Sequence, residues 1–387
     1  LAYANALVAQ YLGAGQPHKC SKVITQGIII SLASTPVLIL ITLLMRNIFA
    51  FMDHTPEQVA LEKTYYDILM LASVITLIKT TLSAFFSGVG RTNVVMVCEV
   101  LGICFNIPLS YILIFGEFGL PAMGMSGAAW GTVISTTLTI IIYLLFYLTR
   151  NNRQTYSIRE SLVFDTGITR RYLRLGFPSG MEMFLNVAAF NLFLLMFHSY
   201  GITEAASATI VFNWDILSFV PLLGLNIAVM SLIGRAVGAN DMTRTNEITA
   251  AGYVLGLSYS LILATTFLFF RHPLVDIFIF QEEGAPAIRE LAGFMMVGLS
   301  CYVLCEGVLQ VAAGVLRGAG DTHWIMAASV SLHWAMLVLQ YFVIKVFLLG
   351  PQLSWITFVI MIFMIVVVFL WRLHGNHWRD PERLRAV

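Results

Sequence analysis

Charged residues are scarce in this sequence. Only 11% of its 387 residues are Asp, Glu, Lys or Arg, whereas 58% are hydrophobic. Soluble domains average about 25% charged residues, so this composition excludes a soluble core of this length. The net charge of +1 gives no basic surface for nucleic acid. Apolar runs long enough to cross a bilayer, about 20 residues each, instead recur along the chain with short polar gaps. The sequence therefore predicts an all-α polytopic membrane protein.

The sequence also lacks the motifs of several catalytic and energy-coupling classes. It contains no Walker sequence, which argues against transport driven by ATP. It contains no His-Glu-x-x-His, Gly-x-Ser-x-Gly or paired-Asp protease motif, which argues against an intramembrane enzyme. We therefore expect neither an enzyme nor a bound organic cofactor.

Cysteine is rare as well, and the five residues are odd in number and mostly lie inside apolar runs. They do not form a disulfide framework. Cys301 and Cys305 share a helix face, which hints at a site for a soft metal, but no His completes it at helical spacing. We expect no metal site.

The start of the chain has no initiator Met, basic segment or cleavage site, and Leu1 lies in the middle of an apolar stretch. We therefore expect at least one further helix before Leu1. Hydropathy between turn signals predicts a partial helix at Leu1–Leu12 and ten full crossings. The ten crossings are Val23–Met45, Leu61–Phe86, Val94–Phe115, Met125–Leu148, Tyr172–Tyr200, Ala205–Ile233, Ile248–Phe270, Ala287–Leu316, Trp324–Leu349 and Leu353–Leu373.

Basic residues orient this array, because loops on the cytoplasmic side of a membrane retain Lys and Arg. Of the 22 basic residues, 16 fall at one set of helix ends and four at the other, and Lys79 and Lys345 lie within helices. The richer set includes the polar stretch 150–171 and the C-terminal tail. We expect both to be cytoplasmic in a multi-pass protein of the inner membrane.

Two short patterns occur twice. Gln10-Tyr-Leu-Gly-Ala-Gly15 is echoed by Arg235-Ala-Val-Gly-Ala-Asn240, and Gly88-Val-Gly-Arg-Thr92 is echoed by Gly318-Ala-Gly-Asp-Thr322. Six crossings separate the copies, so the two halves share their orientation and form a parallel repeat. We expect two pseudo-symmetric helical bundles. The expected divisions are an N-terminal bundle at 1–149, a linker at 150–171, a C-terminal bundle at 172–374 and a tail at 375–387.

An ordered set of motifs resembles the multidrug and toxic compound extrusion (MATE) transporters. No single motif is decisive, but together they span nearly the whole chain in the family's order and spacing. The motifs are Gln10-Tyr-Leu-Gly-Ala-Gly15, Asn106-Ile-Pro108, Gly119-Leu-Pro121, Gly127-Ala-Ala-Trp-Gly-Thr132, Leu175-Gly-Phe-Pro178, Gly234-Arg-Ala-Val-Gly-Ala239 and Ala312-Ala-Gly-Val-Leu-Arg-Gly318.

This resemblance implies a secondary antiporter that exports amphiphilic or cationic organic compounds in exchange for H⁺ or Na⁺ by alternating access. It also implies twelve helices in the intact protein, of which about ten and a half are present here. We expect a monomer in the lipid bilayer, with small organic molecules as partners. The alternative is a flippase or exporter of a lipid-linked or other endogenous metabolite with a related fold. Flippases of that kind usually carry several cavity arginines, whereas the basic residues within helices here are Lys79 and Lys345, and Lys345 is shallower and expected to be structural.

Glu306 is the leading candidate for ion coupling. It lies 11 residues before Arg317, roughly 16 Å from the cytoplasmic helix end and near the middle of the bilayer. Desolvation at that depth disfavours a charged carboxylate, so the group suits proton exchange near neutral pH. Tyr302 and Gln310 share its helix face. The resemblance places Glu306 at the acidic cation site of NorM-like members; the alternative is a packing residue bonded to a neighbour.

Glu182 and Asn186 lie one turn apart on the predicted helix at Tyr172–Tyr200. NorM-like members place a second cation-site carboxylate where this chain has Asn186, which is a departure from the family. An amide oxygen can coordinate a cation but cannot bind a proton. Glu182 could supply the missing charge, or it could line a hydrated vestibule. With a single carboxylate at the site, H⁺ coupling is favoured over Na⁺.

Two further deep charges complete the candidates. Asp215, in Asn213-Trp-Asp215, lies roughly 16 Å from the outer end of its helix and would join an acidic cluster, unless it only caps or pairs locally. Lys79 lies about 12 Å from the cytoplasmic end. It could bind an anionic substrate, act as counter-ion to a carboxylate across the cleft or extend along its helix to the surface. Together with Asn213 and Gln310, Lys79 is expected to line the substrate cavity.

Overall fold

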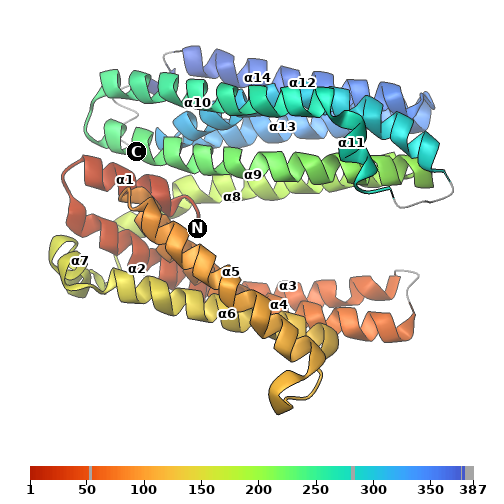
Figure 1. Cartoon of the computed structure of the whole chain (residues 1–387). Helices are drawn as coiled ribbons and strands as arrows, with labels where there is room; N and C mark the ends of the chain where they lie inside the picture. Colours follow the sequence, from red (N-terminus) through yellow and green to blue (C-terminus); the bar gives the residue numbers. More distant parts are fainter. Residues whose placement is uncertain (52–54, 280–283, 376, 380–387) are drawn as a thin grey trace. The chain divides into compact units, whose positions relative to one another are not determined.

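The computed structural model describes residues 1–51, 55–279, 284–375 and 377–379. All regular structure in these residues is helical, and ten helices are long and apolar enough to cross a membrane. The chain divides into two compact units, Leu1–Leu173 and Arg174–Val387 (Figure 1). The predicted fold class, an all-α polytopic membrane protein with ten crossings and one shorter helix, is confirmed.

The first unit contains six helices with apolar sequence and a short helical linker. The apolar helices are α1 (Ala4–Gly13), α2 (Pro17–Ala33), α3 (Thr35–Met45), α4 (Pro56–Gly88), α5 (Thr92–Phe115) and α6 (Gly124–Tyr147). Short 3₁₀ turns follow α3 at Arg46–Phe51 (η1) and α5 at Glu117–Gly119 (η2). The linker contains α7 (Arg150–Thr155) and the 3₁₀ turn η3 (Ile158–Ser161).

The second unit begins inside α8, which runs from Thr166 to His198. Its other elements are α9 (Ile202–Gly238), α10 (Met242–Phe269), α11 (Arg271–Asp276), α12 (Ala285–Gly318), α13 (Thr322–Tyr341), the π-helical turn η4 (Phe342–Val346), α14 (Pro351–His374) and the 3₁₀ turn η5 (His377–Arg379). The predicted tail at 375–387 lies mostly outside the described residues, which end at Arg379.

Several helix boundaries differ from the sequence prediction by a few residues, and two of the differences have a clear local cause. The crossing predicted at Val23–Met45 is split into α2 and α3 at Ser34, because Pro36 lacks the amide that would continue the hydrogen-bond ladder. The helix predicted to start at Tyr172 starts at Thr166, since Asp165 accepts a hydrogen bond from the Ile168 amide and so supports an earlier start.

The two units repeat the same local packing. Gly88 of α4 lies so close to α1 that a Cβ atom would be 2.8 Å from the Asn5 carbonyl oxygen. Gly318 of α12 lies against α9 in the same way, with a Cβ atom 2.7 Å from the Met230 carbonyl oxygen. The turns that follow also match, since Gly90 has φ +80° and Gly320 has φ +86°. These backbone positions explain why both copies of the repeat keep glycine there.

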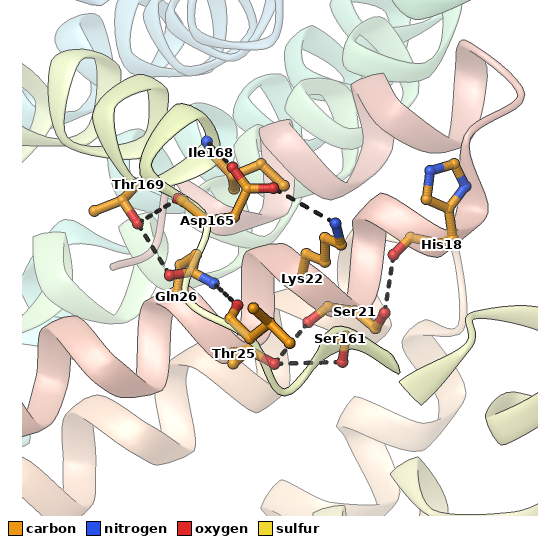
Figure 2. Close-up of polar contacts among 10 residues, drawn as sticks. His18, Ser21, Lys22, Thr25, Gln26, Ser161, Asp165, Ile168 and Thr169 are labelled. Atoms are coloured by element: carbon orange, nitrogen blue, oxygen red, sulfur yellow. Dashed lines mark hydrogen bonds and ion pairs between the residues drawn. The ribbon is translucent and has the colours of Figure 1, made fainter. Parts of the chain in front are cut away.

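The linker is bound to α2 of the first unit. The Gln26 side chain donates to the Val163 carbonyl at 2.9 Å and accepts from the Thr169 hydroxyl at 3.0 Å. Lys22 forms an ion pair with Asp165 at 3.5 Å. Figure 2 shows these side chains converging between α2 and the start of α8. The linker is therefore a structured part of the first unit, and not a free tether.

Asp165→Asn is expected to loosen this attachment. The Ile168 amide and the Lys22 ammonium hold the pKa of the Asp165 carboxyl below its ordinary value. A lowered pKa means that the carboxylate stabilises the fold above the ordinary Asp range, near pH 4, and that this stabilisation is lost as pH falls through the native value. Exposed ion pairs contribute about 0.2–1 kcal/mol, so amide exchange in the linker should rise by up to about fivefold at pH 7.

Hydrogen exchange followed by mass spectrometry measures this effect on residues 156–169. The variant and the wild type should differ at pH 7, and the difference should shrink as the pH falls below the ordinary Asp range, near pH 4, and the wild type loses the charge. Asp67→Asn removes a comparable ion pair, with Arg46 at 3.1 Å, and should leave linker exchange unchanged. Equal exchange of the Asp165 variant and the wild type at pH 7 would show that the ion pair does not hold the linker.

In the second unit, α12 is the central helix. In an apolar 18-residue stretch of α12, 72% of the residues are buried, whereas the corresponding share is 39% in both α9 and α14. An aromatic cluster fixes its middle: the Tyr302 ring packs edge-on to Trp355 and Phe358, and the Trp355 indole donates to the Met295 carbonyl at 3.1 Å. This packing buries the face of α12 that carries Tyr302.

Candidate functional site

Two carboxyl groups from different helices meet in the second unit. Asp215 lies on α9, and Glu306 lies on α12 one turn after Tyr302. The helices can approach closely because Gly314 packs against the Asn226 carbonyl, where a Cβ atom would be 2.9 Å from the oxygen. Asp215, Tyr302 and Glu306 lie within the range of electrostatic interaction with one another.

The surroundings of this carboxyl pair contain few polar groups. Tyr302 is 1% exposed and belongs to a hydrophobic cluster with Phe212, Trp355 and Phe358. Within the described residues, Asp215 Oδ1, Tyr302 Oη and Glu306 Oε2 are buried and have no hydrogen-bond partner. Buried polar atoms without partners cost free energy and are rare in native proteins. Carboxyl oxygens in such a position can hold a proton or a small cation.

The structure thus places three of the predicted coupling residues together, namely Asp215, Tyr302 and Glu306. The expected acidic cluster consists of two carboxyl groups on α9 and α12. Glu182 has a different environment, because its two carboxylate oxygens each accept a hydrogen bond at 2.9 Å from one Arg317 nitrogen. The side chains of Glu182 and Arg317 are 6% and 21% exposed. This buried ion pair joins α8 to α12.

Asn186 belongs to a polar group on α8 and α13. Its amide nitrogen donates to the Ser329 hydroxyl at 2.8 Å, while its Oδ1 is buried without a hydrogen-bond partner. His333 Nδ1 lies 2.8 Å from the Ser329 carbonyl oxygen, and the His333 ring interacts electrostatically with Glu182. Asn186 is therefore held by a hydroxyl group on the neighbouring helix.

Lys79 has a partner in the first unit. Its ammonium lies 2.9 Å from Glu99 Oε2, and the Tyr143 hydroxyl donates to Glu99 Oε1 at 3.1 Å. Of the alternatives for Lys79, the structure shows a carboxylate partner, and that partner lies in the same unit. The side chains of Lys79 and Glu99 are 25% and 38% exposed, so the pair is half-buried.

The two remaining predicted cavity residues, Asn213 and Gln310, each have a hydrogen bond within the second unit. Asn213 is exposed, and its amide donates to the Thr209 carbonyl of its own helix at 2.7 Å. Gln310 is buried, and its backbone carbonyl accepts from the Asn226 side chain at 2.7 Å. No group of three or more potential metal ligands occurs in the described part of the chain.

Sequence reasoning missed Arg317 and His333 as members of this region. Arg317 served only as a marker of the cytoplasmic helix end and as part of a family motif, although it lies one residue before Gly318 at the end of the central helix. His333 lies inside an apolar helix, which is itself a signal, because ionisable residues within membrane spans are rare and usually functional.

Comparison with known proteins gives one family. The model of the MatE family matches residues 4–112 and 178–342. The probable multidrug resistance protein NorM of Pasteurella multocida is 26% identical over 358 residues, covering 90% of this chain and 76% of that protein. The multidrug resistance protein NorM of Photobacterium profundum is 28% identical, covering 85% of this chain and 72% of that protein.

Solved structures share the fold. The crystal structure of a MATE protein in complex with MaL6 has a TM-score of 0.86 at 21% identity, covering 100% of this chain and 84% of that chain. A MOP superfamily transporter from Pyrococcus furiosus has a TM-score of 0.87 at 20% identity, covering 98% and 84% of the two chains.

Proposed function

This chain belongs to the MatE family of transporters, and from that premise we propose that it exports amphiphilic, often cationic, organic compounds in exchange for inflowing protons. It is a multi-pass membrane protein and a transporter, not an enzyme. We further propose that the linker at 150–171 lies on the cytoplasmic side and that the protein resides in the inner membrane, because the basic residues gather at that set of helix ends. The NorM relatives, which are named as multidrug resistance proteins, support the substrate class.

The observation that carries the coupling proposal is the carboxyl pair of Asp215 and Glu306 beside Tyr302. Two negative charges at short range in a poorly hydrated site repel each other, so such a pair is suited to hold one proton between them. With one proton already shared, a second proton that enters from outside would neutralise the pair. Its release to the cytoplasm would restore the charge and with it the attraction for a cationic substrate. This alternation supplies the difference in affinity that antiport requires.

We favour protons over Na⁺ because, among the described residues, the buried unpartnered side-chain atoms at the pair are three oxygens, Asp215 Oδ1, Tyr302 Oη and Glu306 Oε2. The prediction from sequence counted a single carboxylate, Glu306, at the site. Asp215 adds a second one, so the number of charges does not distinguish H⁺ coupling from Na⁺ coupling. Hard cations require several oxygen ligands. Around the pair, Phe212, Trp355 and Cys305 offer none from their side chains. Glu182 is bound by Arg317, and the Asn186 amide nitrogen is bound by Ser329.

Efflux of a cationic dye from proteoliposomes tests the proposal. The expected result is that a pH gradient drives efflux in Na⁺-free buffer and that a Na⁺ gradient without a pH gradient does not. Empty liposomes with the same gradients provide the control for passive leakage of the dye. Efflux that requires Na⁺ at every pH would refute proton coupling, and the absence of efflux under both gradients would refute the substrate class.

A further inference from the structure

An apolar groove lies on the surface of the second unit between α8 and α13. Its volume is about 460 Å³. Its walls are formed by Leu192, Leu195, Met196, Ser199, Trp334, Leu337, Val338, Tyr341 and Lys345. Many of the apolar side chains are exposed, among them Leu195 at 66% and Val338 at 55%. The groove is separate from the carboxyl pair of Asp215 and Glu306 and has no part in the proposed ion coupling.

One end of this groove carries a single positive charge. Lys345 is the only charged residue in its lining, and its ammonium donates to the Ser199 hydroxyl at 2.7 Å. Lys345 forms no ion pair within the part of the chain that the structure describes. The ammonium therefore keeps hydrogen-bonding capacity for an anion at the mouth of the groove.

An unusual backbone holds Lys345 at this end. The last turn after α13 is π-helical at Phe342–Val346, a conformation that is rare and often found at functional sites. Leu348 follows with φ +50°, which is uncommon for a residue other than glycine. The Tyr200 hydroxyl donates to the Leu349 carbonyl at 2.6 Å and anchors this segment to the end of α8. The position of Lys345 is thus fixed by several contacts.

The length of the groove matches one leaflet of a bilayer. From Trp334 to Lys345 the helix rises roughly 16 Å, and half of the hydrocarbon core measures about 15 Å. The charged end lies at the end of α8 that is remote from the linker, since α8 runs from Thr166 to His198 just before Ser199. The groove therefore extends from that membrane surface towards the middle of the bilayer.

We propose that this groove binds an anionic phospholipid, with one acyl chain along the apolar walls and the phosphate at Lys345. The walls provide the hydrophobic contact for a chain, and the lysine provides the charge preference. A transported cation would be repelled at this end, so the occupant differs in chemistry from the proposed substrates.

Native mass spectrometry of the purified full chain tests this site. The protein is exchanged from detergent into mixtures of phosphatidylglycerol and phosphatidylcholine with identical dioleoyl chains, and the retained lipid is counted. The wild type should retain phosphatidylglycerol in preference. Lys345→Gln should reduce that preference roughly fivefold, the effect expected for one lysine near a membrane surface. Val338→Trp fills the groove and leaves Lys345 in place, so it should reduce retention of both lipids.

Lys63→Gln, at the start of α4 in the first unit, is the matched control and should behave as the wild type. Equal retention of the two lipids by the wild type, or an unchanged preference in Lys345→Gln, would overturn the role of the lysine. Unchanged retention in Val338→Trp would overturn the groove as the binding site. None of these measurements depends on transport, so they remain informative if the proposed export fails its own test.

Discussion

Glu306→Gln is expected to abolish gradient-driven dye efflux while the protein still inserts and folds. The substitution removes the titratable group but preserves the shape of a side chain that lies beside the buried Tyr302. Coupling free energies between two sites usually correspond to changes in binding affinity of about 5- to 150-fold. We therefore expect efflux under a pH gradient to fall at least about tenfold in proteoliposomes matched for protein content.

Two further variants make this result specific. Asp215→Asn removes the second carboxyl of the pair and should lower gradient-driven efflux in the same way. Glu290→Gln changes an exposed carboxylate at the start of the same helix and should have no effect. Full transport by Glu306→Gln would show that the coupling proton is carried elsewhere in the protein.

Glu182→Gln is expected to destabilise the second unit strongly. The Arg317 guanidinium would lose the carboxylate that accepts two hydrogen bonds from it, and it would remain mostly buried. Removing one partner of a buried ion pair costs about 3–5 kcal/mol, and partial exposure of Arg317 favours the lower end of that range. The midpoint of thermal unfolding in detergent should fall on the order of 5–10 °C.

The double variant Glu182→Gln with Arg317→Met separates stability from coupling. It removes both charges, so it should recover most of the lost thermal stability. If its proton-driven efflux also recovers, Glu182 serves to hold α8 against α12. A Glu182→Gln protein that melts like the wild type but does not transport would contradict the structural role and make Glu182 a coupling residue.

Much of the candidate site could be predicted from the sequence, because a charged residue inside an apolar helix is energetically costly and therefore easy to recognise. Depth along the helix pointed to Glu306, Tyr302 and Asp215, and the structure brings these three together. Their mutual position depends on the close packing of α9 on α12 at Gly314. Whether two helices pack side by side depends on contacts far apart in sequence, which no local pattern reveals.

The pairing of charges was the least predictable feature. Glu182 and Arg317 are 135 positions apart, and each has a plausible local interpretation when taken alone. Lys79 could equally have reached the membrane surface, and its contact with Glu99 follows from the packing of α4 against α5 and α6. Long side chains reach partners over several ångströms, so small differences in helix rotation decide which partner they meet.

By itself, the sequence determined the membrane class, the number of crossings in this chain and the internal repeat. These features depend on local hydrophobicity and on turn residues such as Gly90 and Gly320, whose backbone angles are the ones their pattern indicated. Only the tertiary structure decided that Asp215 faces Glu306, that Arg317 binds Glu182, and that the linker joins α2. The physical reason is that hydrophobic burial in a bilayer acts on each helix separately, whereas the environment of a charge depends on all the helices around it.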